Sequence, residues 1–137
     1  MQYTNFVGMN YTTVQKFILD AGYHITYQNQ NDGVFIIENK LDGVENLIIG
    51  VAPPILIFEM YLFTIASDNM QVFKSLLIKN RDILHGAFAL NEDGTKVLYR
   101  YSIQIENIDF NEFEAAITSL SMLLSEYSKQ LIDFSKK

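Results

Sequence analysis

The longest periodic segment of the chain, residues 108–134, constrains the fold most, because its pattern predicts one long amphipathic helix. Asp109 is placed to cap the N-terminus with Glu112 three residues on, and Ile108 and Phe113 occupy the two hydrophobic-staple positions. One face is apolar along the whole length. Its residues are Phe113, Ala116, Ile117, Leu120, Leu123, Leu124, Tyr127, Leu131 and Phe134. The rest of the chain is expected to pack against this face.

Two further helices are expected. Thr12 and Gln15 form a second capping box, and Gly22 supplies the C-terminal stop of that helix. Ser67 is the expected cap of a helix that continues to Asn80. The residues expected on the buried side of this helix are Met70, Phe73, Leu76 and Leu77.

Up to six segments have β-type patterns and are separated by turn residues. They are residues 23–28, 34–39, 46–51, 55–64, 86–91 and 95–105. The connections within each group of strands are short enough for antiparallel pairing. The sequence therefore predicts a single α+β domain over residues 1–137. Its antiparallel sheet has five or six strands, and its elements follow the order α-β-β-β(-β)-α-β-β-α.

The length of the last helix has a consequence for its end. About 26 residues span roughly 39 Å, whereas five or six strands make a sheet only about 24 to 29 Å wide. The last turns, around Leu131 and Phe134, are thus expected to extend beyond the sheet. Their cover would come from the first helix, from a bend or from a second subunit.

The strand at residues 55–64 is apolar on both faces. Leu56, Phe58, Met60 and Leu62 form one row, and the other row contains Ile55, Ile57, Tyr61 and Phe63, with Glu59 between them. If helices cover one side of the sheet only, the second row needs cover from elsewhere in the chain or from a second protein.

Glu59 is expected to meet Arg100 across the sheet. The pair is either a polar anchor within a binding surface or a structural ion pair on the outer face. The candidate binding residues on the outer face of the sheet are Ile55, Ile57, Glu59, Tyr61, Phe63 and Arg100.

Composition limits the class of partner and the compartment. Sixteen acidic and ten basic residues give a net charge of -6, which argues against nucleic acid or an anionic membrane as partner. The absence of cysteine excludes disulfides and thiolate chemistry and fits a reducing compartment. Neither a signal peptide nor a membrane span is recognisable, so a cytoplasmic protein without membrane insertion is expected.

No arrangement of residues predicts catalysis. His24 and His85 have no acidic or cysteine neighbours at metal-ligand spacing, and the serines of the long helix follow no nucleophile motif. No two carboxylates are predicted to share a cleft, which leaves a hydrolase or transferase without support. The sequence therefore predicts a protein without catalytic residues, bound metal or cofactor.

Residues 80–124 resemble the YbjN-like family, which shares its fold with the type III secretion chaperones and is often labelled Tir-chaperone-like. The resemblance lies in Asn80, the HGAF stretch at residues 85–88, the Asp93-Gly94 turn, Arg100 and the run at residues 106–112. It implies an antiparallel sheet with the first and third helices on one face, and a homodimer. It also implies a non-enzymatic module that binds extended segments of a partner protein. The alternative is a small-molecule sensor in which Glu59 or Arg100 orients the ligand.

Overall fold

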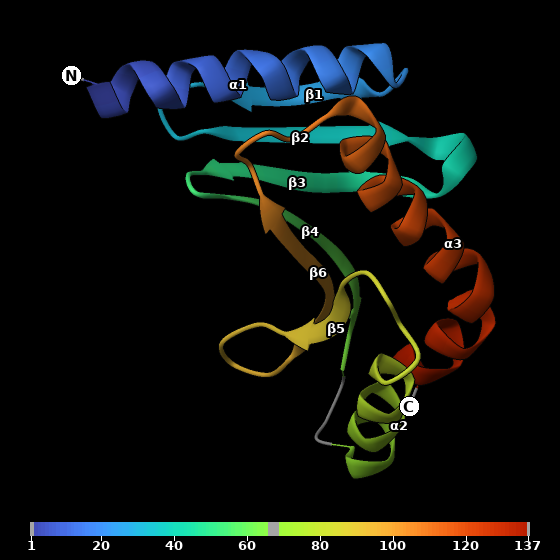
Figure 1. Ribbon diagram of the computed structural model, residues 1–137. Helices are drawn as coiled ribbons and strands as arrows, with labels where there is room; N and C mark the ends of the chain where they lie inside the picture. The colour runs from blue at the N-terminus through green and yellow to red at the C-terminus, as the bar shows by residue number, and fades with distance from the viewer. Residues whose placement is uncertain (1, 66–68, 137) are drawn as a thin grey trace.

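A computed structural model describes residues 2–65 and 69–136. Within these residues the order of the main elements is α1-β1-β2-β3-β4-α2-β5-β6-α3 (Figure 1). The helices are α1 (Gln2–Asp20), α2 (Met70–Asn80) and α3 (Phe110–Ser135). The strands are β1 (His24–Asn29), β2 (Val34–Asn39), β3 (Val44–Ala52), β4 (Ile55–Thr64), β5 (Ala87–Leu90) and β6 (Lys96–Gln104). The predicted α+β class and element order are confirmed.

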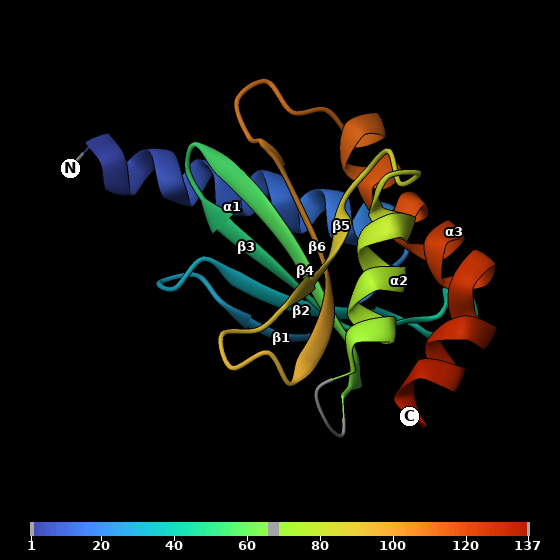
Figure 2. The ribbon, with the colours of Figure 1, turned by 90° about the horizontal axis from the view of Figure 1, so that it is seen from below.

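The six strands form one antiparallel sheet in the order β1-β2-β3-β4-β6-β5. All three helices lie on one side of it. Phe35 of β2 stacks on Tyr11 of α1, while Phe58 of β4 contacts Phe113 of α3. Phe88 of β5 faces α2 and α3. Figure 2 shows α2 and α3 next to each other and α1 crossing behind the strands. The hydrophobic core fills the space between this helical layer and the sheet.

Helix α1 begins earlier than predicted, so the expected N-terminal capping box at Thr12 and Gln15 is wrong. Thr12 lies inside the helix, which begins at Gln2. Tyr11, one residue before Thr12, is buried, and its ring centroid lies 4.2 Å from that of Phe35. Packing of Tyr11 on the sheet thus requires helical backbone before the predicted cap. The predicted stop at Gly22 is confirmed, since this residue adopts a φ of 84°.

The buried side of α2 differs from the prediction. Val72 and Leu76 are buried, whereas Met70 and Leu77 are 81% and 70% exposed. Among the described residues, α2 contacts β5 and the end of α3, and the side chains buried there are Val72 and Leu76. The N-cap is Asn69, whose side chain accepts a hydrogen bond from the Val72 amide at 3.2 Å. The predicted cap, Ser67, lies outside the described residues.

Helix α3 begins as predicted. The Asp109 side chain accepts from the Glu112 amide at 2.8 Å, and the Glu112 side chain accepts from the Asp109 amide at 3.2 Å, which completes the capping box. Phe113, at the second staple position, is fully buried. Ile108, at the first, packs against the core.

The end of α3 finds its cover within the chain. The Phe134 ring lies 6.4 Å from the Phe63 ring at the end of β4, and Lys79 of α2 places its Nζ 5.7 Å from the centre of the Phe134 ring. The first helix instead packs on the opposite end of α3, where Phe17 lies 5.6 Å from Phe113. The sequence left the first helix, a bend or a second subunit as the source of this cover, whereas the contacts of Phe134 are with α2 and the end of β4.

Candidate functional site

The side of the sheet that faces away from the helices is the candidate site, and we call it the outer sheet face. Strand register places its side chains in rows that alternate with the buried ones. The outer sheet face consists of Tyr27, Val34, Ile36, Ile48, Gly50, Ala52, Ile55, Ile57, Glu59, Tyr61, Ala87, Ala89, Leu98, Arg100, Ser102 and Gln104.

Much of this face is apolar and open. Ile48 is 41% exposed and Tyr61 is 51% exposed, while Ile55 and Ile57 are half-buried. None of the described helices packs on this side of the sheet. An apolar sheet face without cover within its own chain is typical of a protein interaction surface.

Glu59 and Arg100 meet as the sequence predicted. They are direct cross-strand neighbours, and the Arg100 guanidinium donates to Glu59 Oε2 at 3.4 Å. Their side chains remain 31% and 47% exposed, respectively. A solvated pair of this kind contributes about 0.2–1 kcal/mol to stability. The pair therefore contributes little to the stability of the fold, and its charges remain accessible to a partner.

Phe63 does not belong to the outer sheet face, and its place in the predicted set is wrong. The pairing of β4 with β6 shifts register between Tyr61 and Phe63. This irregularity turns Phe63 to the helical side, where it is 5% exposed and contacts Phe134. The two-residue alternation of the sequence does not indicate this register shift. The other predicted residues, Ile55, Ile57, Glu59, Tyr61 and Arg100, share one face.

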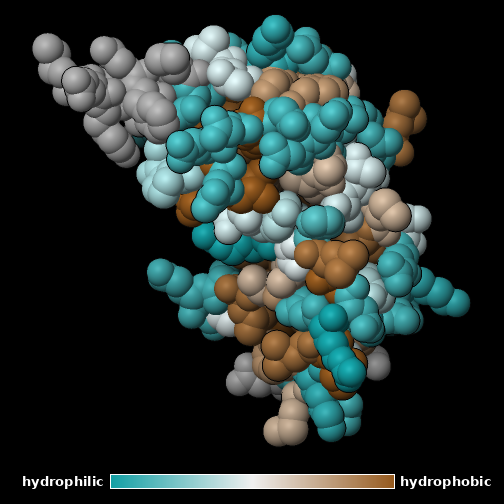
Figure 3. Space-filling view, viewed as in Figure 1, coloured by the Kyte–Doolittle hydropathy of each residue, from teal (hydrophilic) through white to brown (hydrophobic). Residues whose placement is uncertain are grey.

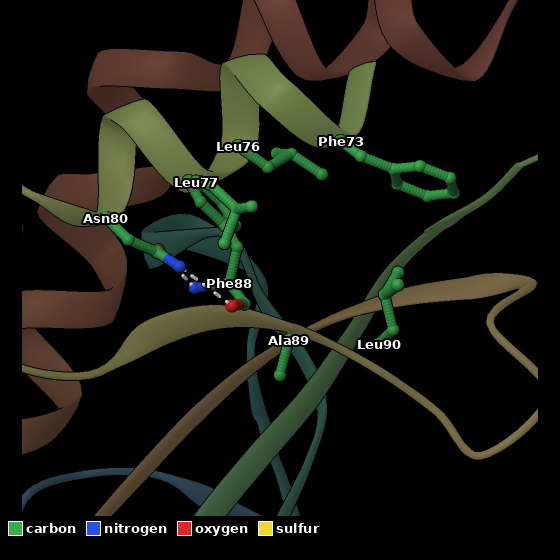
Figure 4. Close-up of a pocket in the computed structure, with 7 residues that line it drawn as sticks. All are labelled: Phe73, Leu76, Leu77, Asn80, Phe88, Ala89 and Leu90. Atoms are coloured by element: carbon green, nitrogen blue, oxygen red, sulfur yellow. Dashed lines mark hydrogen bonds between the residues drawn. The ribbon is translucent and has the colours of Figure 1, made fainter. Parts of the chain in front are cut away.

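An apolar groove lies between α2 and β5, and the sequence did not predict it. This apolar groove has a volume of about 260 Å³. Figure 4 shows Phe73, Leu76 and Leu77 pointing from α2 towards Phe88 and Leu90 of β5. The space-filling view shows apolar surface around α2 in the lower part of the molecule (Figure 3).

Asn80 closes one end of this groove and protects the edge of the sheet. Its Nδ2 donates to the Phe88 carbonyl at 3.0 Å, and its Oδ1 accepts from the Phe88 amide at 2.7 Å. The side chain thus takes the place that a neighbouring strand would take along edge strand β5. Asn80 was noticed in the sequence only through the family resemblance, because no local pattern indicates a contact with a later strand.

We predict that Asn80→Ala lowers the free energy of unfolding by about 1–3 kcal/mol, because it leaves two backbone groups of Phe88 without partners. Hydrogen exchange of the Phe88 amide should accelerate strongly. The matched control is Asn29→Ala, which removes a hydrogen bond of 3.1 Å to Asp32 in an exposed turn. If exchange at Phe88 is unchanged in Asn80→Ala, water satisfies this edge and Asn80 does not protect it.

Two further pockets lie beside α3, and neither includes Glu59 or Arg100. One, of about 320 Å³, includes Asp82, Glu126 and Tyr127, and the other, of about 460 Å³, lies between α3 and the start of β3. Burial, followed by the nearby Glu126 and Asp82 carboxylates, raises the pKa of Tyr127.

The sensor alternative required an enclosed pocket at Glu59 and Arg100. These two residues lie on the open outer sheet face, whose geometry does not support such a pocket.

The histidines lie apart from any group of metal ligands. His85 Nδ1 lies 3.2 Å from the Tyr101 hydroxyl. In residues 2–65 and 69–136, no group of three or more histidine or carboxylate side chains is placed to hold a metal ion. Among the helices described, none combines the length and the apolar character required to cross a membrane.

Comparison with known proteins places this geometry in a family. The family model CesT_Tir_1 matches residues 8–137. A search of curated proteins finds no match. Among solved structures, YbjN from E. coli has a TM-score of 0.64 at 16% identity, with 87% of this chain and 91% of YbjN covered.

Two chaperone complexes have the same fold. A chain of the HopA1–SchA chaperone–effector complex has a TM-score of 0.62 at 11% identity, with 95% of this chain and 96% of that chain covered. The complex of the Yersinia pestis type III secretion chaperone SycH with a stable fragment of YscM2 has a TM-score of 0.57 at 15% identity, with 92% and 99% covered. The predicted resemblance to YbjN and to the type III secretion chaperones is confirmed, and the chain belongs to the CesT_Tir_1 family.

Proposed function

We propose that this protein is a chaperone-like binding module, without catalytic activity, that binds an extended segment of a partner protein. The observation that carries the proposal is the outer sheet face, an apolar surface that lies opposite all three helices. Membership of the CesT_Tir_1 family supports it. SchA and SycH, which share the fold, were each solved in a complex with another protein.

The physical basis of binding is burial of the apolar side chains that the fold leaves open. Ile48, Ile57 and Tyr61 each retain accessible surface on adjacent strands, so an extended segment lying along the strands would remove several of them from water at once. An extended segment also matches the side-chain repeat of a sheet, since residues two apart lie on the same face of both.

We propose further that the functional unit is a homodimer. The net charge of -6 keeps separate copies apart in general, so association requires a specific apolar surface. The structure offers two such surfaces, the outer sheet face and the groove between α2 and β5. A dimer would present its partner with two copies of the binding surface and would raise the affinity for a long segment.

The test is capture of the partner by matched baits. We expect Ile57→Asp to reduce the amount of a captured protein at least about tenfold, because a carboxylate within the contact would be buried without a partner. The control is Lys129→Glu, a charge reversal at an exposed position of α3, which should capture as the wild type does. Purified partner should then show protection from hydrogen exchange over one continuous segment.

Two results would count against the proposal. Equal capture by Ile57→Asp and by the wild type would show that the outer sheet face takes no part. Protection spread over a folded domain of the partner would exclude an extended segment. Thermal unfolding of both baits checks that loss of capture does not come from loss of the fold.

A further inference from the structure

The sheet opens between its two central strands. At one end, the pairing of β3 with β4 stops at Ile48 and Glu59. Beyond this pair, β3 still pairs with β2 and β4 still pairs with β6, but β3 and β4 no longer pair with each other. Asn46 has a φ of 52°, which interrupts the extended backbone of β3 at the opening. Figure 1 shows β4 curving away from β3, with α3 running across the open side.

Each of the two strands therefore has a free backbone edge at this opening, which we call the β3–β4 wedge. The free edges are residues 44–47 of β3 and residues 60–64 of β4. Within the described residues, no turn or loop forms a backbone hydrogen bond with either edge. A free strand edge is a row of N–H and C=O groups with which another extended chain can pair. The wedge thus matches the hydrogen-bonding pattern of a polypeptide backbone.

The wedge is also hollow, and much of its lining is apolar. The pocket between β3, β4 and α3 has a volume of about 460 Å³, within the range of roughly 300–1,000 Å³ that is usual for ligand sites. Leu62 of β4 and Leu124 and Ile132 of α3 line it. Ile132 is 55% exposed, so apolar surface in the wedge remains open to water. Apolar side chains that point from an inserted strand towards α3 would be buried there.

We infer that the β3–β4 wedge binds an extended stretch of the partner segment through backbone hydrogen bonds, with apolar side chains turned towards α3 at every second position. The inference rests on the proposed function, to whose partner segment it assigns a second contact. Ile48 at the start of the opening and Tyr61 in its lining also belong to the outer sheet face. A segment that lies on the outer sheet face therefore reaches the wedge without a break.

The free edges select an extended chain over other occupants. A helix has its backbone groups paired internally and would leave both edges without partners. A small apolar molecule would fill the pocket but would form no ladder of hydrogen bonds. Only an extended polypeptide matches the free edges and the apolar lining together.

Charge indicates which residues flank the apolar positions of the segment. Glu45 is the charged residue in the lining of the wedge, and it is exposed. It forms no ion pair with any residue that the structure describes. The chain as a whole has a net charge of -6. A segment with lysine or arginine beside its apolar residues is therefore favoured over an acidic one.

The test is binding of a synthetic, fluorescein-labelled peptide in which leucine alternates with threonine and two lysines follow. We expect fluorescence anisotropy to show binding, and we expect hydrogen exchange to slow at the amides of residues 60–64 that face the wedge. Two further versions of the peptide are N-methylated at the leucines or at the threonines. Each keeps its side chains but loses the amide donors along one edge, so at least one should bind at least about tenfold more weakly.

Protein variants test the two kinds of lining. Ile132→Asp should weaken binding at least about tenfold, because the peptide would bury the new carboxylate. Its matched control is Met122→Asp, at an apolar residue of α3 that is 66% exposed and lies outside the wedge. Glu45→Lys should weaken binding, and a peptide that ends in two glutamates should restore it. Glu92→Lys, in the turn before β6, is the control for the charge reversal, and thermal unfolding shows that each variant is folded.

Three results would overturn the inference. These are a peptide that does not bind, N-methylated versions that both bind as the parent peptide does, and unchanged exchange at residues 60–64 with the peptide bound. The second result would identify an apolar site without backbone pairing. Loss of partner capture in Ile57→Asp together with a failed peptide test would leave the proposed function standing. Peptide binding in the wedge together with equal capture by Ile57→Asp and the wild type would do the reverse.

Discussion

Replacing Phe113 with alanine is expected to lower the free energy of unfolding by about 3–5 kcal/mol, a large part of the stability of a domain of this size. Phe113 is fully buried. Its ring lies 5.6 Å from that of Phe17 in α1 and 5.8 Å from that of Phe58 in β4. The side chain thus joins both N- and C-terminal helices to the sheet, and its removal leaves a cavity at their junction that rigid neighbours cannot fill.

The matched control is Phe110→Ala, a substitution of the same residue type in the first turn of the same helix. Phe110 also contacts Phe17, at 5.9 Å, but its side chain is only half-buried. Its loss should therefore cost clearly less, on the order of 1–2 kcal/mol. Urea unfolding followed by circular dichroism measures both. Equal losses in the two variants would show that the junction at Phe113 is not the tightly packed point of the core.

Gly86→Ala is expected to cost about 2–5 kcal/mol, although it adds only one methyl group. Gly86 has a φ of 85°, and a Cβ there would lie 2.5 Å from the Tyr99 hydroxyl and 2.6 Å from its ring. Tyr99 cannot move aside easily, because it is fully buried and its hydroxyl donates to the His85 carbonyl at 3.0 Å. The burial of Tyr99 also raises the pKa of its hydroxyl well above the ordinary value.

The loss of stability in Gly86→Ala has two causes, the positive φ and the close contact with Tyr99, and Gly22→Ala separates them. Gly22 has a φ of 84°, close to that of Gly86, but a Cβ there would meet no atom within 4 Å. This control should therefore lose only the backbone contribution of about 1–2 kcal/mol. Thermal and urea unfolding of both variants give the difference. If the two alanine variants are equally stable, the close approach of Tyr99 to Gly86 contributes nothing.

Most of the secondary structure could be predicted from the sequence because its determinants are local. The capping box at Asp109 and Glu112 depends on residues close together in the sequence, and so do the boundaries of β4. The structure confirms both. Alternation also placed Arg100 on the more polar row of its strand and so suggested its contact with Glu59, but the register itself comes from tertiary pairing, because α2 and β5 separate β4 from β6 in the chain. Only the capping box and the strand boundaries need no knowledge of the rest of the chain.

The features that were predicted wrongly depend on distant residues. Thr12 became a helix-interior residue because Tyr11 packs on Phe35, a contact with a later strand. Phe63 left the outer sheet face because β4 shifts register against β6, and Leu77 became exposed because α2 has neighbours on one side only. Local propensity contains no information on such contacts, and tertiary packing overrides it.

By itself, the sequence determined a long capped helix, a set of antiparallel strands, and one strand with too many apolar residues for a single buried face. Only the tertiary structure decided that all three helices lie on the same side of the sheet and that Asn80 protects its edge. It alone also aligned Ile48, Glu59, Arg100 and Ala87 in one row. The physical reason is that the amphipathic pattern of an element indicates how much apolar surface it must bury. Which other element covers that surface depends on the packing of all elements together.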